Sequence, residues 1–301
     1  MSIQETLAGT GVALVTPFKN NGDVDYKSLQ KLVNFVIGNG VQYVVTLGTT
    51  GETPTLNYEE KAEIIRSTFA AVRSRVPVVI GIGGNNTNEI CKDLQTLPVE
   101  GAAAILSASP YYSKPSQEGI YQHYKTIASI SSKPIILYNV PGRTGSNMTA
   151  ATTTRLAHEV DNIVGMKEAS GNMGQCMQIL RDKPKDFLVV SGDDMLAMAQ
   201  IACGMDGVIS VAANCFPKEF CAMVAAALAD DYNTARTINN SLLEGYELLF
   251  MENNPAGVKA VLSELGVIEN NLRLPLVPLS PPVTERVKAY IRILYKTLHN
   301  A

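Results

Sequence analysis

The chain has no tryptophan, few charges and few of the residues that usually hold a metal ion. Charged residues make up 18% of its 301 positions, the formal net charge is −3, and no block of lysine and arginine stands out. A nucleic acid or an anionic membrane surface is therefore not expected as a partner. The three histidines, His123, His158 and His299, are widely separated. A multi-histidine metal site is therefore not predicted either.

The cysteines and the apolar segments also exclude several classes of protein. There are five cysteines and no C-x-x-C pair, and the odd number argues against a disulfide framework. No apolar run approaches the roughly 20 residues that span a bilayer. The first residues, MSIQETLAGTG, lack the basic start and apolar stretch of a signal peptide. We therefore expect a cytoplasmic protein in a reducing compartment, without a membrane segment.

Short apolar runs alternate with longer amphipathic segments over most of the chain. The runs are rich in Val, Ile and Leu without clean polar alternation, which is typical of parallel strands buried on both faces. They are Gly11–Pro17, Tyr43–Gly48, Val76–Gly81, Ala102–Pro110, Pro134–Val140, Ile163–Lys167, Phe187–Ser191 and Gly207–Val211. Helical segments between them include Asp25–Asn39, Asn57–Arg73, Gln117–Ile130 and Met195–Ala202. This alternation predicts a parallel α/β architecture.

The positions of the polar motifs favour a closed (β/α)₈ TIM barrel over a doubly wound sheet. Barrel enzymes carry their sites at the C-terminal ends of the strands. Here GTTGE, SPYY, YNVPGRT, KEAS and SGDD each end or follow a predicted strand. From about Phe216 the alternation stops and only helices are predicted, through Phe250, over Pro255–Leu265 and over Val283–Leu298, with Pro255 early in its helix. We therefore expect a barrel domain over residues 1–225 and a helical C-terminal domain over residues 226–301.

Lys167 stands at the end of the sixth apolar run, where the strand should be buried. Such a lysine could extend to solvent or pair with Glu168, and spacing alone does not choose between these possibilities and a catalytic one. Inside a barrel mouth, burial would disfavour the ammonium form, and a neutral amine can attack a ketone to form an imine. Loss of a proton next to the imine would then give an enamine nucleophile.

Three other groups could serve the same site, although each also has a simpler explanation. Tyr138 could move protons at the imine carbon, or it could be a core tyrosine. Thr49 and Thr50 could bind a small carboxylate, or cap a helix with Glu52 as a first-turn acid. Arg143 could hold a carboxylate bidentately, or lie on the surface.

Two polar motifs are expected to be structural. The segment GIGGNN, from Gly81 to Asn86, lacks the G-K-[ST] ending of a phosphate-binding loop. Asp193 and Asp194 are expected to cap a helix rather than to bind a metal.

Taken in order, the motifs GTTGE, PYY, YNVPGRT and GMKEASG resemble the dihydrodipicolinate synthase family of pyruvate-dependent class I aldolases. The likeness extends through SGDD, GVISV and NPAGVK to LRLPLVPL, and so covers nearly the whole chain. It implies a lyase that condenses pyruvate with L-aspartate 4-semialdehyde to 4-hydroxy-tetrahydrodipicolinate, in lysine and diaminopimelate biosynthesis. It also implies no cofactor besides the covalent pyruvate imine, and a homotetramer built as a dimer of dimers.

The resemblance assigns the proton chemistry to four residues. It implies that Lys167 forms the Schiff base with pyruvate. It further implies that Thr49, Tyr138 and Tyr112 form a proton relay, in which Tyr112 reaches into the site of a neighbouring subunit.

The resemblance also assigns the binding of two carboxylates. It implies that Thr50 binds the carboxylate of pyruvate, helped by the backbone near Gly192 and Ile209, and that Arg143 holds the carboxylate of the semialdehyde. The family's usual YNVPSRT reads YNVPGRT here, with Gly142 in place of serine. Glycine loosens the loop, but Arg143 is kept, so we expect the same reaction.

Two other functions are weighed against this one. A sister aldolase for a sialic acid or keto-deoxy sugar acid would share the lysine and the tyrosine. Arg143 favours the synthase, because only that reaction brings a second carboxylate to this loop. A silent barrel that senses a keto acid would have lost Lys167 or Tyr138, and both are present.

Three positions resemble a regulatory lysine-binding site of the family, namely Asn85, Glu89 and Tyr111. Two further positions, often histidine in inhibited members, are Tyr58 and Lys61. A second positive charge beside a cationic ligand opposes its binding. We therefore expect weak or absent feedback inhibition by L-lysine.

Overall fold

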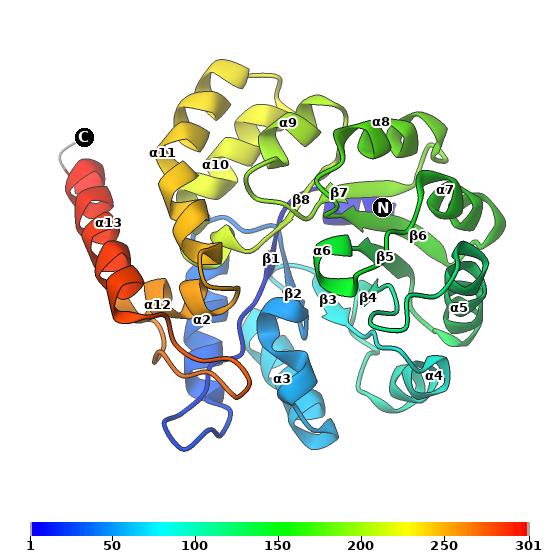
Figure 1. Cartoon of the computed structure of the whole chain (residues 1–301), viewed down its shortest axis with the longest axis horizontal. Helices are drawn as coiled ribbons and strands as arrows, with labels where there is room; N and C mark the ends of the chain where they lie inside the picture. Colours follow the sequence, from blue (N-terminus) through cyan, green and yellow to red (C-terminus); the bar gives the residue numbers. More distant parts are fainter. Residues whose placement is uncertain (1, 300–301) are drawn as a thin grey trace.

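The protein is a closed barrel of eight parallel strands surrounded by helices (Figure 1). The computed structural model describes residues 2–299, with side chains up to residue 294. Each strand pairs with the next in chain order, and β8 pairs with β1 to close the barrel. The strands are β1 (Gly9–Ala13), β2 (Tyr43–Thr46), β3 (Val78–Gly81), β4 (Ala104–Ala108), β5 (Ile135–Asn139), β6 (Ile163–Glu168), β7 (Leu188–Ser191) and β8 (Gly207–Ser210).

The predicted barrel is confirmed, and all eight predicted runs contain a strand. The largest difference is at the first run, where β1 starts at Gly9 and ends at Ala13, and Leu14–Phe18 continue as a buried loop. The prediction therefore placed the C-terminal end of this strand too late, because the residues after Ala13 are buried although they do not belong to the strand. Pro17 in this segment lacks the N–H that a strand would use in the sheet.

Most helices on the outside of the barrel begin at a residue whose side chain caps the helix, whereas α6, α9 and α10 have no side-chain cap. Asp25 accepts from Ser28 N at the start of α2, and Asn57 forms a capping box with Glu60 at the start of α3. Up to β8 the helices are α1 (Ile3–Leu7), α2 (Tyr26–Gly38), α3 (Tyr58–Val72), α4 (Thr87–Thr96), α5 (Gln117–Ile130), α6 (Pro141–Thr144), α7 (Ala150–Glu159), α8 (Met173–Asp182) and α9 (Ala197–Ala202). Short 3₁₀ turns are η1 (Thr49–Gly51), η2 (Thr53–Thr55) and η3 (Ala212–Asn214).

Two layers of apolar packing hold the barrel together. Alternate strand residues point inward and form an inner cluster with Leu7 of α1, while the others pack against the helices. The Tyr43 ring crosses the inside of the barrel over Gly11, where an added Cβ would lie 2.1 Å from the ring. This alternation places Tyr138 inside the barrel and its neighbour Leu137 outside it.

The C-terminal helices differ from the prediction in their first part. The long Ala-rich stretch is two helices, α10 (Pro217–Leu228) and α11 (Tyr232–Phe250), and Asp231 caps the second. Helix α10 contacts β1, β8 and α9, so it completes the ring around the barrel. A boundary between residues 225 and 226 would fall inside this helix. The turn between α10 and α11, just before Tyr232, would be a boundary that divides no helix.

The last two helices are α12 (Ala256–Glu264) and α13 (Pro281–His299). Both lie with α11 at one side of the barrel (Figure 1). Pro255 is the cap residue immediately before α12. It therefore lies one position ahead of the helical position that the sequence predicted.

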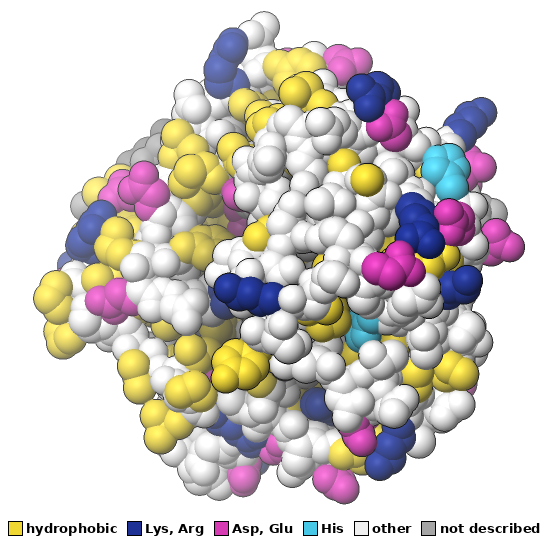
Figure 2. Space-filling view, turned by 45° about the vertical axis from the view of Figure 1, so that its right-hand side comes forward, with side chains coloured by type: hydrophobic (Ala, Val, Ile, Leu, Met, Phe, Trp, Pro, Cys, Tyr) yellow, Lys and Arg dark blue, Asp and Glu magenta, His cyan; other side chains and the backbone are white. Residues whose placement is uncertain are grey.

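The face of the molecule shown in Figure 2 carries charges of both signs. On the face shown in Figure 2, lysine and arginine side chains alternate with acidic ones. Among residues 2–299, no helix is long and apolar enough to cross a membrane. In the same part of the chain, no group of three or more His, Cys, Asp and Glu side chains could hold a metal ion.

Candidate active site

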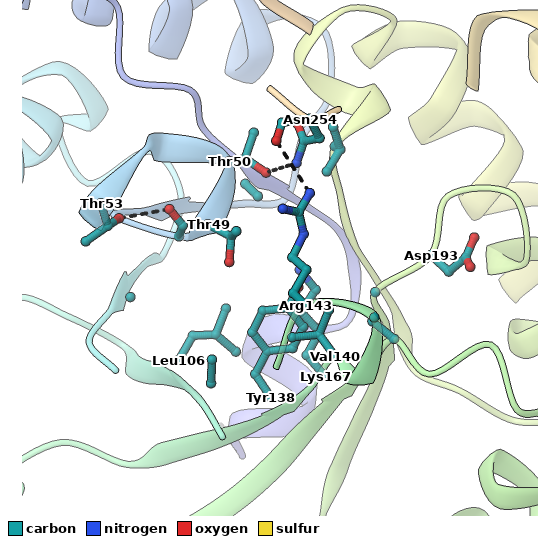
Figure 3. A pocket seen from close by; sticks show the side chains of 18 of the residues that line it. Thr49, Thr50, Thr53, Leu106, Tyr138, Val140, Arg143, Lys167, Asp193 and Asn254 are labelled. Atoms are coloured by element: carbon teal, nitrogen blue, oxygen red, sulfur yellow. Dashed lines mark hydrogen bonds between the residues drawn. The ribbon is translucent and has the colours of Figure 1, made fainter. Parts of the chain in front are cut away.

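A cavity of about 950 Å³ opens at the C-terminal ends of the strands. Its walls come from the strand ends, from the loops that follow them, and from the segment between α11 and α12. Six of the eight residues that the resemblance assigns to catalysis or substrate binding line this cavity. Figure 3 labels Thr49, Thr50, Tyr138, Arg143 and Lys167, and Gly192 is the sixth.

Lys167 is buried in the cavity wall and faces Tyr138. The two residues are register partners on β6 and β5, and Lys167 Nζ lies 4.3 Å from the centre of the Tyr138 ring. The side chains are 4% and 8% exposed, so Lys167 does not extend to solvent. No carboxylate of the described residues lies within ion-pair distance of its amine. The amine therefore has neither of the structural roles that the sequence left open.

The neighbours of Lys167 explain why its amine has no carboxylate partner and how its side chain fits into the cavity wall. Glu168 points to the outer side of the barrel, where Asn139 Nδ2, Gln175 Nε2 and Ser170 N donate to its carboxylate. At Gly192 an added Cβ would lie 2.8 Å from Lys167 Cε. The glycine of SGDD thus leaves room for the lysine side chain.

The GTTGE motif forms the short turn η1 at the cavity. Thr50 is buried, and its Oγ1 accepts from Asn254 Nδ2 at 3.0 Å. Thr49 is partly exposed at the cavity wall. Glu52 does not have the role of a first-turn acid, which was one of the alternatives that the sequence left open. Glu52 has left-handed backbone (φ 54°) and pairs at 2.5 Å with Lys259 Nζ, with both side chains fully buried.

Arg143 lies in α6, which follows β5, and lines the cavity. Its Nη2 donates to the Asn254 carbonyl at 3.4 Å. No acidic side chain of residues 2–294 forms an ion pair with it. Most of the guanidinium fork is therefore available to a carboxylate ligand. Nothing lies within 4 Å of a Cβ added at Gly142, so packing does not explain why glycine replaces serine there.

Two residues assigned by the resemblance do not line this cavity. Tyr112 is 90% exposed with a φ of 67°, and Ile209 is buried inside β8. Tyr111 does line the cavity. One chain therefore brings Thr49 and Tyr138 to the site but leaves Tyr112 facing outward.

The three residues that resemble a regulatory site lie on successive segments: Asn85 in the loop after β3, Glu89 on α4, and Tyr111 in the loop after β4. Asn85 Oδ1 accepts from Tyr111 N at 2.9 Å, and Glu89 is exposed in the first turn of α4. Lys61 lines the cavity, while the Tyr58 hydroxyl donates to a backbone carbonyl at the end of α4.

Sequence reasoning missed the roles of Asp194 and Asn254. Asp194 is not a helix cap, because its buried carboxylate accepts from Val211 N and Ala212 N across the cavity wall. Burial raises the pKa of Asp194 to about 6. Asp193 does accept from Met195 N in a local cap. Asn254 belongs to the NPAGVK motif. From the sequence alone, this motif predicted the start of a helix and no contact with the cavity.

The comparisons with known proteins agree on one family. The model of the Dihydrodipicolinate synthetase family matches residues 6–294. A protein of Parabacteroides distasonis described as 4-hydroxy-tetrahydrodipicolinate synthase is 54% identical, covering 96% of this chain and 97% of its own.

Solved structures give the same result. Dihydrodipicolinate synthase from Aquifex aeolicus superposes with a TM-score of 0.93 at 39% identity, covering 96% of this chain and 98% of that one. A dihydrodipicolinate synthase from Acinetobacter baumannii, solved in complex with pyruvate, has a TM-score of 0.92 at 42% identity, with coverage of 95% and 98%.

Proposed function

This chain belongs to the dihydrodipicolinate synthetase family, and from that premise we propose that Lys167 carries the reaction as a Schiff base with pyruvate. The reaction is the condensation of pyruvate with L-aspartate 4-semialdehyde, a lyase step of lysine and diaminopimelate biosynthesis. The observation that carries the assignment is the buried Lys167 amine, which faces Tyr138 and has no carboxylate partner among the described residues.

The cavity supplies the groups that this chemistry needs. The Lys167 amine attacks the ketone carbon of pyruvate, and loss of water gives a protonated imine. Loss of a methyl proton then gives the enamine, whose carbon attacks the aldehyde of the second substrate. Thr50 and the backbone near Gly192 and Ile209 bind the pyruvate carboxylate. Arg143 holds the carboxylate of the semialdehyde. No separate cofactor takes part.

Proton transfer in this mechanism needs more than one subunit. Tyr138 and Thr49 share the cavity, and the third member of the relay is Tyr112 of a neighbouring subunit. The 90% exposure of Tyr112 in the single chain supports this proposal, because the side chain is open to a neighbouring subunit and does not line the cavity of its own chain. We therefore propose a homotetramer built as a dimer of dimers, working in the cytoplasm.

Borohydride trapping tests the assignment directly. Incubation with pyruvate and borohydride should add a reduced pyruvate adduct to the peptide that contains Lys167, detected by mass spectrometry. The Lys167→Ala variant should show no adduct at this peptide while keeping the wild-type circular dichroism spectrum. An adduct at another active-site lysine would refute the role of Lys167. Faster cleavage of N-acetylneuraminate than condensation of the semialdehyde would favour the sugar-acid aldolase instead.

A further inference from the structure

The C-terminal helical part contributes one side chain that lies between the two carboxylate-binding groups. Asn254, just before α12, donates from Nδ2 to Thr50 Oγ1 at 3.0 Å. Its backbone carbonyl accepts from Arg143 Nη2 at 3.4 Å (Figure 3). Asn254 is 5% exposed and lines the cavity. One residue thus contacts the groups assigned to both substrates.

The bond from Asn254 decides how the Thr50 hydroxyl is used. A hydroxyl has one proton to donate and two lone pairs to accept with. The Asn254 amide occupies a lone pair, and no described group accepts a hydrogen bond from Thr50 Oγ1. The hydroxyl proton therefore remains available to a ligand in the cavity, and an oriented O–H donor suits a carboxylate.

The same two segments are fastened together at a second point. Glu52, which follows Thr50 in the GTTGE motif, forms the buried ion pair with Lys259, which follows Asn254 in NPAGVK. Lys259 Nζ also donates to Asn271 O, and Arg273 N donates to the second Glu52 oxygen. The segment that carries Asn254 is therefore tied to the GTTGE turn by an ion pair whose two side chains are fully buried, which limits the movement of Asn254 relative to Thr50.

We propose that Asn254 is a positioning residue that holds the Thr50 hydroxyl as a donor toward the pyruvate carboxylate. The inference rests on the proposed function, because it takes Thr50 as the ligand of that carboxylate. Asn254 acts through Thr50 and contacts no reacting atom. Its loss should therefore weaken pyruvate binding more than it slows turnover.

A double-mutant cycle tests this coupling. Asn254→Ala should raise the KM for pyruvate roughly three- to tenfold, the scale of one hydrogen bond, with a smaller change in kcat. In a Thr50→Val background the same substitution should add less than about twofold, because no hydroxyl remains to be oriented. An equal increase of KM in both backgrounds, or no increase in the wild-type background, would overturn the proposal.

The nearly isosteric Asn254→Asp variant separates orientation from space filling. Its carboxylate cannot donate, so the Thr50 proton would turn toward Asp and away from pyruvate. We expect a KM at least as high as that of Asn254→Ala. If Asp instead restores wild-type KM, the amide only fills space and the proposal fails, even if the alanine variant does not fold.

A matched control exists on α11. Asn239 is also buried, accepts from the Tyr246 hydroxyl at 3.4 Å, and does not line the cavity. Asn239→Ala should leave the KM for pyruvate unchanged.

Borohydride trapping distinguishes a failure of the proposed function from a failure of the positioning role. Absence of a Lys167 adduct in the wild type would refute the proposed function itself. An adduct that forms with the same pyruvate half-saturation in wild type and Asn254→Ala would refute only the positioning role.

Discussion

Tyr138 and Lys167 are register partners on adjacent strands of the barrel, with Lys167 Nζ 4.3 Å from the centre of the Tyr138 ring. Parallel neighbours in register point to the same side of the sheet, so both side chains enter the barrel together. The phenol is thus held beside the carbon that would be attached to Lys167, because the pairing of β5 and β6 brings the two side chains together.

Tyr138→Phe should reduce turnover by about 10²–10⁴, the usual scale for loss of a general acid or base. The ring and its packing remain, so pyruvate binding should change less than kcat. Steady-state kinetics together with the pyruvate dependence of borohydride trapping would measure both effects. A variant with wild-type kcat would show that the phenol is only part of the core.

Arg143→Ala should impair the use of L-aspartate 4-semialdehyde more than formation of the pyruvate adduct. A lost charged hydrogen bond costs roughly 1.5–3 kcal/mol, or about tenfold and more in kcat/KM. Arg143→Lys keeps the charge without the fork and should recover only part of the loss. Equal damage to both substrates would contradict a role specific to the second carboxylate.

L-Lysine should inhibit weakly or not at all. Lys61 lines the cavity close to α4, where Asp93 interacts with both Lys61 and Glu89. A cationic ligand near Glu89 would therefore meet the Lys61 charge. The measurement is the initial rate at subsaturating pyruvate across a lysine titration, and Lys61→Ala should increase sensitivity. Strong inhibition of the wild type at submillimolar lysine would show that Lys61 does not block the site.

Removing one member of the buried Glu52–Lys259 pair should destabilise the protein strongly. Burial lowers the pKa of Lys259 to about 8, against the effect of Glu52, which favours the charged form. Lys259→Met leaves the Glu52 carboxylate buried without a cation and should cost about 3–5 kcal/mol in denaturant unfolding. The double variant Glu52→Gln, Lys259→Met should lose less, because no charge stays unpaired. Greater loss in the double variant would contradict this reasoning.

His123 should make the protein less stable in mild acid. Burial lowers the pKa of His123 from 6.5 to about 4 in the folded state, so the unfolded chain binds a proton first as pH falls. The stability from the neutral ring is present above pH 6.5 and is lost as pH falls from 6.5 toward 4. Between pH 7 and 5 this loss amounts to roughly 2 kcal/mol. Urea titrations should show a smaller loss in His123→Phe, and an equal loss would exclude His123 as the cause.

The strands, their order and the side of the barrel that carries the site could be predicted from the sequence. A continuous apolar run reports a strand buried on both faces, and chain order determines which strands are neighbours in a barrel. Lys167 ends the sixth run and Tyr138 lies near the end of the fifth, so their proximity follows from that order. The resemblance added the roles of Thr49, Thr50 and Arg143, and the structure brings these side chains to the same cavity.

Only the tertiary structure decided which polar groups form pairs in the buried region next to that cavity. Glu52 and Lys259, or Thr50 and Asn254, lie in segments far apart in the chain. Periodicity tells which face of a segment is buried but not what that face meets. The local pattern predicted Asp194 to be a helix cap and allowed Glu52 to be a first-turn acid, whereas both are buried acceptors. A buried charge needs a partner, and only the folded chain shows that the C-terminal helices provide one for the barrel.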